Sequence, residues 1–191
     1  MSDPAQHLGL LIVDLQPSLL KKIPNAAALV SRVQFAVSAA EILGVQIACT
    51  EQAPKKLGAT IPAVVEKVSG ELPTFEKTAF SAFEAAGIER WIEANQIDHL
   101  LLAGVETPIC IYQTAIAAMG KDIGVTLLSD CIGCRRPADA APVIQQLLTI
   151  EAMVLPSETI FYSLAGDSAH RSFSALTQLS KEFDANQSIE D

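Results

Sequence analysis

Short apolar runs alternate along the chain with longer stretches in which apolar residues recur every three or four positions. The short runs have the length of buried strands, and the longer stretches have the spacing of helices with one apolar face. We expect strands at residues 8–13, 45–49, 73–76, 99–105, 124–129 and 152–155, and helices at 25–43, 84–95, 108–119, 138–149, 157–164 and 169–183. This order predicts an α/β fold in which helices cover both faces of a mostly parallel sheet.

The stretch from Asn25 to Leu43 shows the helical pattern most clearly. Its apolar residues Leu29, Val33 and Val37 are spaced to lie on one face of a helix. Gly44 follows directly, where a glycine commonly ends a helix.

Residues 52–74 interrupt the alternation with three prolines, two glycines and the pair Lys55-Lys56. Such punctuation indicates an excursion over the surface, which is suited to roofing a pocket. Residues 1–183, with this excursion included, are expected to form one domain, and the polar residues 184–191 a C-terminal tail.

Composition narrows the function classes. The chain has 191 residues, of which 50% are hydrophobic and 18% charged, so it is long and apolar enough for one domain with a sizeable core. Its 13 basic and 22 acidic residues give a formal net charge of −9, which lacks the basic character that nucleic-acid binding requires. No apolar run approaches the roughly 18 residues of a membrane span. Four cysteines and an N-terminus without a basic leader favour a cytoplasmic protein.

Three residues of possible chemical importance follow apolar runs. Asp14 comes directly after the first strand, Lys77 follows the third, and Cys110 lies a few residues beyond the fourth. In parallel sheets the ligand crevice lies beyond the carboxyl ends of the strands, so all three are expected at one edge. Each alone also fits an ordinary structural role: a turn aspartate, a solvated lysine or a buried apolar cysteine. Together they supply a nucleophile, a base and a cation.

Cys110 has the most specific setting of the three. The pair Thr107-Pro108 resembles an N-cap followed by proline at the first helical position, which places Cys110 third in the helix. Free N–H groups and the helix dipole favour a thiolate there. The Val105-Glu106 bond lies in the preceding turn, where a pair of N–H groups that bind an oxyanion is able to form.

A histidine partner for the cysteine has little support. His7 and His99 precede their strands and therefore lie at the opposite edge of the sheet, and His170 belongs to the C-terminal helical segment. Only His170 stays open as an alternative base.

Other motifs suggest weaker possibilities. Cys131 and Cys134 form a C-x-x-C that is compatible with a redox pair or half of a zinc site, although no further zinc ligands are near. The adjacent Arg135 and Arg136 are able to bind a substrate carboxylate or to pair with local acids. Neither G-x-G-x-x-G nor a P-loop is present, so we expect no cofactor and no metal.

Several segments resemble the isochorismatase-like cysteine hydrolases, and among them the uncharacterised isochorismatase domain-containing branch. The matching segments are residues 11–16, 50–52, 75–81 and 104–114, with Ser157-Glu158 near the end. The resemblance implies a Rossmann-like, three-layer α/β/α fold with a six-stranded sheet and an Asp14-Lys77-Cys110 triad. It also implies a cis peptide between Val105 and Glu106, and an oxyanion hole formed by the N–H groups of Glu106 and Cys110.

The sequence also lacks the residue patterns of two well-known groups of enzymes in this family. True isochorismatases typically lack the cysteine, which makes that reaction an unsuitable expectation for a chain with Cys110. Nicotinamidases carry an Asp-x-His metal motif after the second strand, but residues 49–53 contain no histidine. The resemblance therefore does not imply a metal.

We accordingly expect a hydrolase that cleaves an amide or related C–N bond of a small molecule through a thioester on Cys110. Asp14 would act as the base, Lys77 would stabilise charge, and Gln16, Gln52 and Phe80 would line the substrate pocket. The alanine-rich helices favour a homo-oligomer. Two alternatives remain: a non-enzymatic oligomeric scaffold or small-molecule sensor with a vestigial site, and redox chemistry at Cys131 and Cys134.

Overall fold

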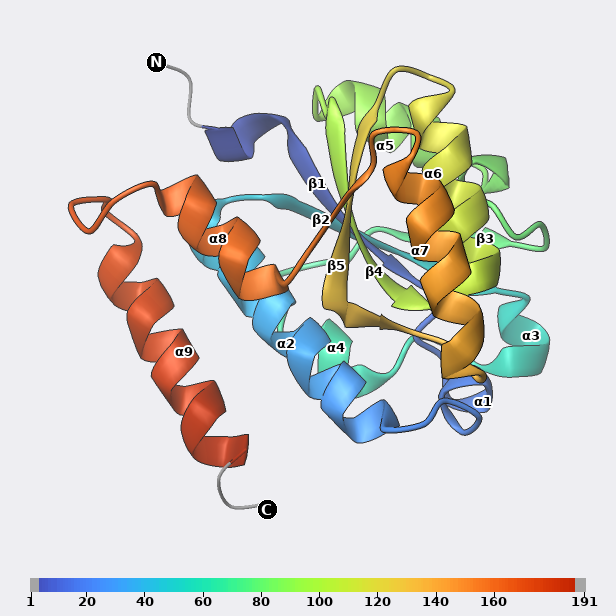
Figure 1. Cartoon of the computed structure of the whole chain (residues 1–191), viewed down its shortest axis with the longest axis horizontal. Helices are drawn as coiled ribbons and strands as arrows, with labels where there is room; N and C mark the ends of the chain where they lie inside the picture. Colours follow the sequence, from blue (N-terminus) through green and yellow to red (C-terminus); the bar gives the residue numbers. More distant parts are fainter. Residues whose placement is uncertain (1–3, 188–191) are drawn as a thin grey trace.

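A computed structural model describes residues 4–187 of the chain. Its centre is a six-stranded sheet in the order β3-β2-β1-β4-β5-β6 (Figure 1). The strands are β1 (Leu8–Val13), β2 (Gln46–Gln52), β3 (Thr74–Lys77), β4 (His99–Val105), β5 (Gly124–Gly133) and β6 (Met153–Leu155). Every neighbouring pair is parallel, so the six expected strands are confirmed and the sheet is entirely rather than mostly parallel.

Helices cover both faces of the sheet, as Figure 1 shows. One face carries α2 (Ala26–Leu43), α8 (Ser157–Ala165) and α9 (Phe173–Gln187), and the other carries α5 (Ile88–Ala94), α6 (Tyr112–Met119) and α7 (Ala140–Leu148). Each face of the sheet has its own hydrophobic core. Along β1, Leu10 and Ile12 belong to the core under α2, α8 and α9, whereas Leu11 and Val13 belong to the core under α5, α6 and α7. Strands buried on both faces have no polar face, which explains their continuous apolar runs. The three-layer α/β/α fold is confirmed.

The long helix α2 is the main covering element of its face. It ends at Gly44, whose φ of 75° is a conformation that glycine adopts without steric cost, as the sequence predicted. By length and composition α2 is also apolar enough to cross a membrane, with a mean hydropathy of 1.4. In the structure this apolar surface packs on the sheet, where Val33, Ala36 and Val37 are fully buried.

Several elements differ from the predicted boundaries. The excursion after β2 contains two single helical turns, α3 (Pro54–Leu57) and α4 (Pro62–Val65), and a third turn, α1 (Pro17–Leu20), follows β1. Each begins with proline, which fits the first position of a helix as well as a loop. At the other end α9 extends to Gln187, four residues into the expected tail. Residues 188–191 of that tail lie outside the described part of the chain.

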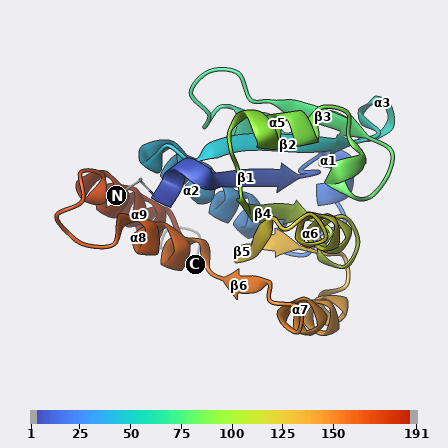
Figure 2. The same ribbon diagram turned by 90° about the horizontal axis from the view of Figure 1, so that it is seen from above.

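The strand order places one crevice at a defined point. Figure 2 shows the strands from β3 and β2 at the top, through β1 and β4, to β6 at the bottom. The chain runs outward from β1 towards β3, and then from β4 towards β6 on the other side. At such a switch point the connections leave in opposite directions, and a crevice opens beyond the carboxyl ends of the two central strands. Asp14 and Cys110 follow these two strands.

Candidate active site

Asp14, Lys77 and Cys110 come together at the carboxyl edge of the sheet. The Lys77 Nζ atom lies 2.6 Å from Asp14 Oδ2, and both side chains are fully buried. The same nitrogen lies 3.7 Å from the Cys110 Sγ atom, and Cys110 is only 6% exposed. Three residues that lie far apart in the chain therefore form one buried cluster.

Asp14 is held by the neighbouring strand β2. Its backbone N–H donates to the Thr50 carbonyl at 3.1 Å, and the Thr50 hydroxyl donates to Asp14 Oδ1 at 2.8 Å. Asp14 has a φ of 55°, in the left-handed region where aspartate and asparagine are enriched. Thr50 was not singled out from the sequence because its role depends on the parallel register that pairs it with Val13.

Lys77 is the last residue of β3 and pairs with Gln52 of β2. Its ammonium donates to the Gln52 side-chain oxygen at 2.7 Å, and more weakly to the Ala79 carbonyl at 3.4 Å. A buried ammonium needs acceptors for its three protons, and here Asp14, Gln52 and the Ala79 carbonyl supply them, with the Cys110 sulfur close by.

Cys110 lies in a π-helical turn, residues Thr107–Ile111, that leads into α6. The N-cap is Glu106 rather than Thr107, so Cys110 is the fourth residue of the turn and not the third as expected. Burial and then the charge of Asp14 raise the pKa of the Cys110 thiol to about 12, although Lys77 opposes the shift. This direction is opposite to the one that the helix start alone favours. The buried Asp14 carboxylate beside Cys110 thus favours the protonated thiol over the thiolate.

The segment before Cys110 has the backbone geometry that the family resemblance implies. The Val105-Glu106 peptide bond is cis. The Glu106 carboxylate accepts from the Arg135 Nε at 2.7 Å and from the Arg135 backbone N–H at 3.0 Å. Arg136 in turn pairs with Asp139 at 2.7 Å. Both arginines are thus engaged by local acids, one of the two roles that the sequence left open.

The three residues expected to line the pocket have different surroundings. Gln16 is fully buried, and backbone groups satisfy its side-chain amide. Gln52 is half-buried and uses its amide on Lys77 and on the Thr78 carbonyl. Phe80 is 50% exposed, which leaves its ring available to a bound molecule.

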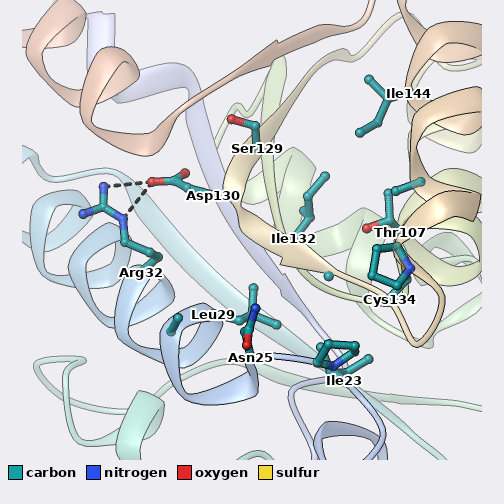
Figure 3. Close-up of a pocket in the computed structure, with 15 residues that line it drawn as sticks. Ile23, Asn25, Leu29, Arg32, Thr107, Ser129, Asp130, Ile132, Cys134 and Ile144 are labelled. Atoms are coloured by element: carbon teal, nitrogen blue, oxygen red, sulfur yellow. Dashed lines mark hydrogen bonds and ion pairs between the residues drawn. The ribbon is translucent and has the colours of Figure 1, made fainter. Parts of the chain in front are cut away.

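Several cavities lie near this edge of the sheet. One, of about 510 Å³, is bordered by Lys77, Lys55 and Glu84. Figure 3 shows another, of about 310 Å³, between the start of α2, the end of β5 and α7. Asp14, Lys77 and Cys110 do not line this second cavity, and of the turn that carries Cys110 only Thr107 reaches it.

The histidines lie away from the cysteine. His99 opens β4 and bonds to Thr126, and His7 bonds to the Gln96 carbonyl before β1. His170 accepts from the Ser172 N–H, and the Ser172 hydroxyl donates to the Ile42 carbonyl near the end of α2. Since α2 ends where β2 begins, His170 lies at the amino edge of the sheet. None of the three histidines, all within the described residues, therefore lies beside Cys110.

The C-x-x-C motif is not arranged as a helix start. Cys131 lies inside β5, where its thiol donates to the Arg32 carbonyl, whereas the Cys134 thiol donates to the Arg136 carbonyl. All four cysteines are free. Within residues 4–187, no group of three or more histidine, cysteine or acidic side chains is placed to hold a metal ion.

Comparison with known proteins gives consistent matches. The sequence matches the isochorismatase domain over residues 9–159. Isochorismatase domain-containing protein 2 from Bos taurus is 32% identical over 155 residues, which cover 81% of this chain and 74% of that protein. The structure of MAR1 ribonuclease from Caenorhabditis elegans has a TM-score of 0.85 at 26% identity, over 92% of this chain and 90% of that one. The YcaC gene product of Escherichia coli, described as an octameric hydrolase of unknown specificity, shares the fold with a TM-score of 0.85 at 16% identity, over 98% and 95% of the two chains.

Proposed function

This chain belongs to the isochorismatase domain family, and from that premise we propose that it is a cysteine hydrolase that cleaves an amide or related C–N bond of a small molecule. The observation that carries the proposal is the fully buried Asp14–Lys77 pair, with the ammonium 3.7 Å from the Cys110 sulfur. Burying two charges is costly. A buried carboxylate and ammonium beside a thiol are well suited to assisting proton transfer from it, which gives a reason for keeping them there despite this cost.

The first half of the reaction forms a thioester. The Cys110 sulfur attacks the carbonyl carbon while the thiol proton passes to the Asp14 carboxylate, which lies in the same buried cluster. Asp14 then gives this proton to the nitrogen as the C–N bond breaks, and the amine leaves. The backbone N–H groups of Glu106 and Cys110 bind the oxyanion that forms on the substrate oxygen.

The second half restores the enzyme. Asp14 takes a proton from water as the water attacks the thioester carbon, the acid leaves, and the sulfur recovers the proton. Lys77 balances the Asp14 charge at rest and the negative charge near sulfur when Asp14 is protonated. Phe80, with its exposed ring, is the proposed contact to the apolar part of the substrate.

A ribonuclease function, suggested by the name of the Caenorhabditis elegans protein, is less well supported. The formal net charge of −9 opposes binding of a polyanion. An RNA oligonucleotide therefore belongs in the substrate panel as a competing outcome.

Substitution of the nucleophile tests the proposal. We expect Cys110→Ala to abolish amine or ammonia release from a panel of small amides, and mass spectrometry of the wild-type protein to detect an acyl adduct on Cys110. The matched control is Cys134→Ala, because Cys134 is also 6% exposed but lies outside the triad. Full activity of the Cys110→Ala variant on a confirmed substrate would refute the mechanism. A folded wild type that turns over no member of the panel, with no adduct, would favour the vestigial scaffold or sensor instead.

A homo-oligomer in the cytoplasm is the proposed state of the protein. Exposed apolar side chains gather where α7 ends and where β6 forms the edge of the sheet: Leu148 is 50% exposed, Met153 45% and Leu155 37%. Exposed apolar groups at a sheet edge favour association. A strictly monomeric mass by light scattering at micromolar concentration would overturn this part, and cell fractionation checks the location.

A further inference from the structure

The amide of Gln52 makes the closest contact to Lys77 apart from Asp14. Its Oε1 accepts from the ammonium at 2.7 Å, and its Nε2 donates to the Thr78 carbonyl at 2.7 Å. A carbonyl only accepts and an ammonium only donates, so these two partners determine which way the amide faces. Each end of the amide thus has one partner within the protein, and the pair of bonds places the Oε1 atom against the ammonium.

Gln16 in turn holds the backbone of Gln52. The Gln16 Oε1 accepts from the Gln52 N–H at 2.8 Å, and its Nε2 donates to the Gln52 carbonyl at 3.1 Å and to the Gly58 carbonyl. Gln16 is fully buried. Its amide is a rigid link between the turn after β1 and the last residue of β2.

The absence of charge on the Gln52 amide also affects the site. Asp14 and Lys77 together are electrically neutral, and a glutamine accepts the lysine proton without adding charge. A carboxylate in its place would leave the site with a net negative charge beside the sulfur. Negative charge near a thiol disfavours its ionisation.

From these contacts we infer that Gln52 is a positioning residue for Lys77: its amide holds one ammonium proton, and this orients the Lys77 Nζ towards Asp14 and Cys110. Gln16 supports this role by fixing the Gln52 backbone. The inference rests on the proposed function only in assigning Lys77 a catalytic role. It differs from the pocket-lining role expected from the sequence, because Gln52 acts through Lys77 and not on the substrate.

Alkylation of Cys110 tests the inference without a known substrate. The full-length protein is treated with iodoacetamide between pH 7 and 10, and the rate at Cys110 is followed by peptide mass spectrometry. We expect Gln52→Glu to lower the rate about tenfold at a given pH, which corresponds to a rise of about one unit in the apparent pKa. Gln52→Met keeps the length without an acceptor or a charge, so the lysine is less well held, and we expect a severalfold lower rate.

A matched control is Gln34→Glu. Gln34 is half-buried and its amide donates to the Ala63 carbonyl at 2.8 Å, on a segment that does not contact Lys77. We expect this variant to react at the wild-type rate. Thermal unfolding confirms that each variant is folded. If a Gln52 variant does not fold, Gln52→Asn takes its place.

The outcomes separate the two claims. A wild-type rate in Gln52→Met overturns the positioning role, even if Gln52→Glu is slow, because charge alone would then explain the result. Once a substrate is known, a raised KM with an unchanged alkylation profile would likewise overturn it, in favour of substrate contact. Cys110-dependent amide hydrolysis with unaffected Gln52 variants would leave the proposed function intact. Slowed alkylation in a protein that hydrolyses nothing would refute only the proposed function.

Discussion

The Asp14–Lys77 pair beyond β1 and the Asp130–Arg32 pair at the end of β5 differ in what surrounds the carboxylate. Asp130 accepts from Arg32 at 2.8 Å, from the Ser157 backbone N–H at 2.8 Å and from the Ser157 hydroxyl at 2.7 Å. These bonds join α2, β5 and the start of α8, and Figure 3 shows the Arg32–Asp130 contact. Burial raises the pKa of Asp130, but the hydrogen bonds from Ser157 and Arg32 outweigh it, and the pKa falls below its ordinary value.

The hydrogen bonds to Asp14 differ from those to Asp130, whose partners Arg32 and Ser157 do not give up a proton. Besides Thr50 and Lys77 its carboxylate faces the Cys110 thiol, a donor that is able to give up its proton. Both side chains of this pair are fully buried, whereas those of Asp130 and Arg32 are 22% and 19% exposed. The comparison indicates that Asp130 is a structural clamp, whereas the surroundings of Asp14 support its proposed role as a proton acceptor, although both are aspartates paired with a cation at the same edge.

The largest expected effect is on activity. Asp14→Asn keeps a residue that tolerates the positive φ but removes the base for both proton transfers, so we expect kcat/KM on a confirmed amide to fall by about 10⁴-fold. The matched change Asp130→Asn should alter kcat/KM by less than about tenfold, because it leaves the triad untouched. Steady-state assays of both variants check the contrast. Equal losses of kcat/KM in the two variants would show that Asp14 and Asp130 do not differ in their importance for the reaction.

The second expected effect is on stability. Lys77→Met leaves the buried Asp14 carboxylate without its cation, and we expect unfolding by urea to become easier by about 3 kcal/mol. Arg32→Met removes a partner from a partly exposed carboxylate that keeps both Ser157 donors, so a loss of about 1–2 kcal/mol is expected.

The double variant Asp14→Asn with Lys77→Met checks the cause of the larger loss. It should recover part of the stability, because no isolated charge stays buried. A Lys77→Met protein as stable as the wild type would mean that water reaches Asp14.

The sequence was sufficient to predict the strands and the triad for one physical reason. Parallel strands covered on both faces must be apolar throughout, and their carboxyl ends meet at one edge, so residues that follow apolar runs converge there. Asp14, Lys77 and Cys110 were found in this way. The motif resemblance added the cis peptide between Val105 and Glu106, which the alternation of elements does not contain.

What the sequence could not predict depends on register and on short-range geometry. Thr50 reaches Asp14 only because β1 and β2 pair in one particular register. The side chains of Gln16 and Gln52 were assigned to the pocket, but their directions depend on which backbone groups lack partners. The helix start before Cys110 could be found from the sequence, but the buried carboxylate beside its sulfur, which acts on the pKa of the thiol in the opposite direction, depends on the fold.

The smallest expected effect is the acid dependence of stability. Asp130 has an ordinary pKa of 3.8, and its pKa in the folded protein is lower. Its contribution to stability is therefore complete above about pH 4, the unfolded value, and is lost as the pH falls through the folded pKa. Asp130→Asn cannot titrate, so its unfolding free energy should fall less steeply than that of the wild type below about pH 4. Urea unfolding at a series of pH values measures both slopes. Parallel slopes would mean that Asp130 is not held in its ionised form by Ser157 and Arg32, and the distinction between a clamp and a proton acceptor would then rest on the activity of the two asparagine variants alone.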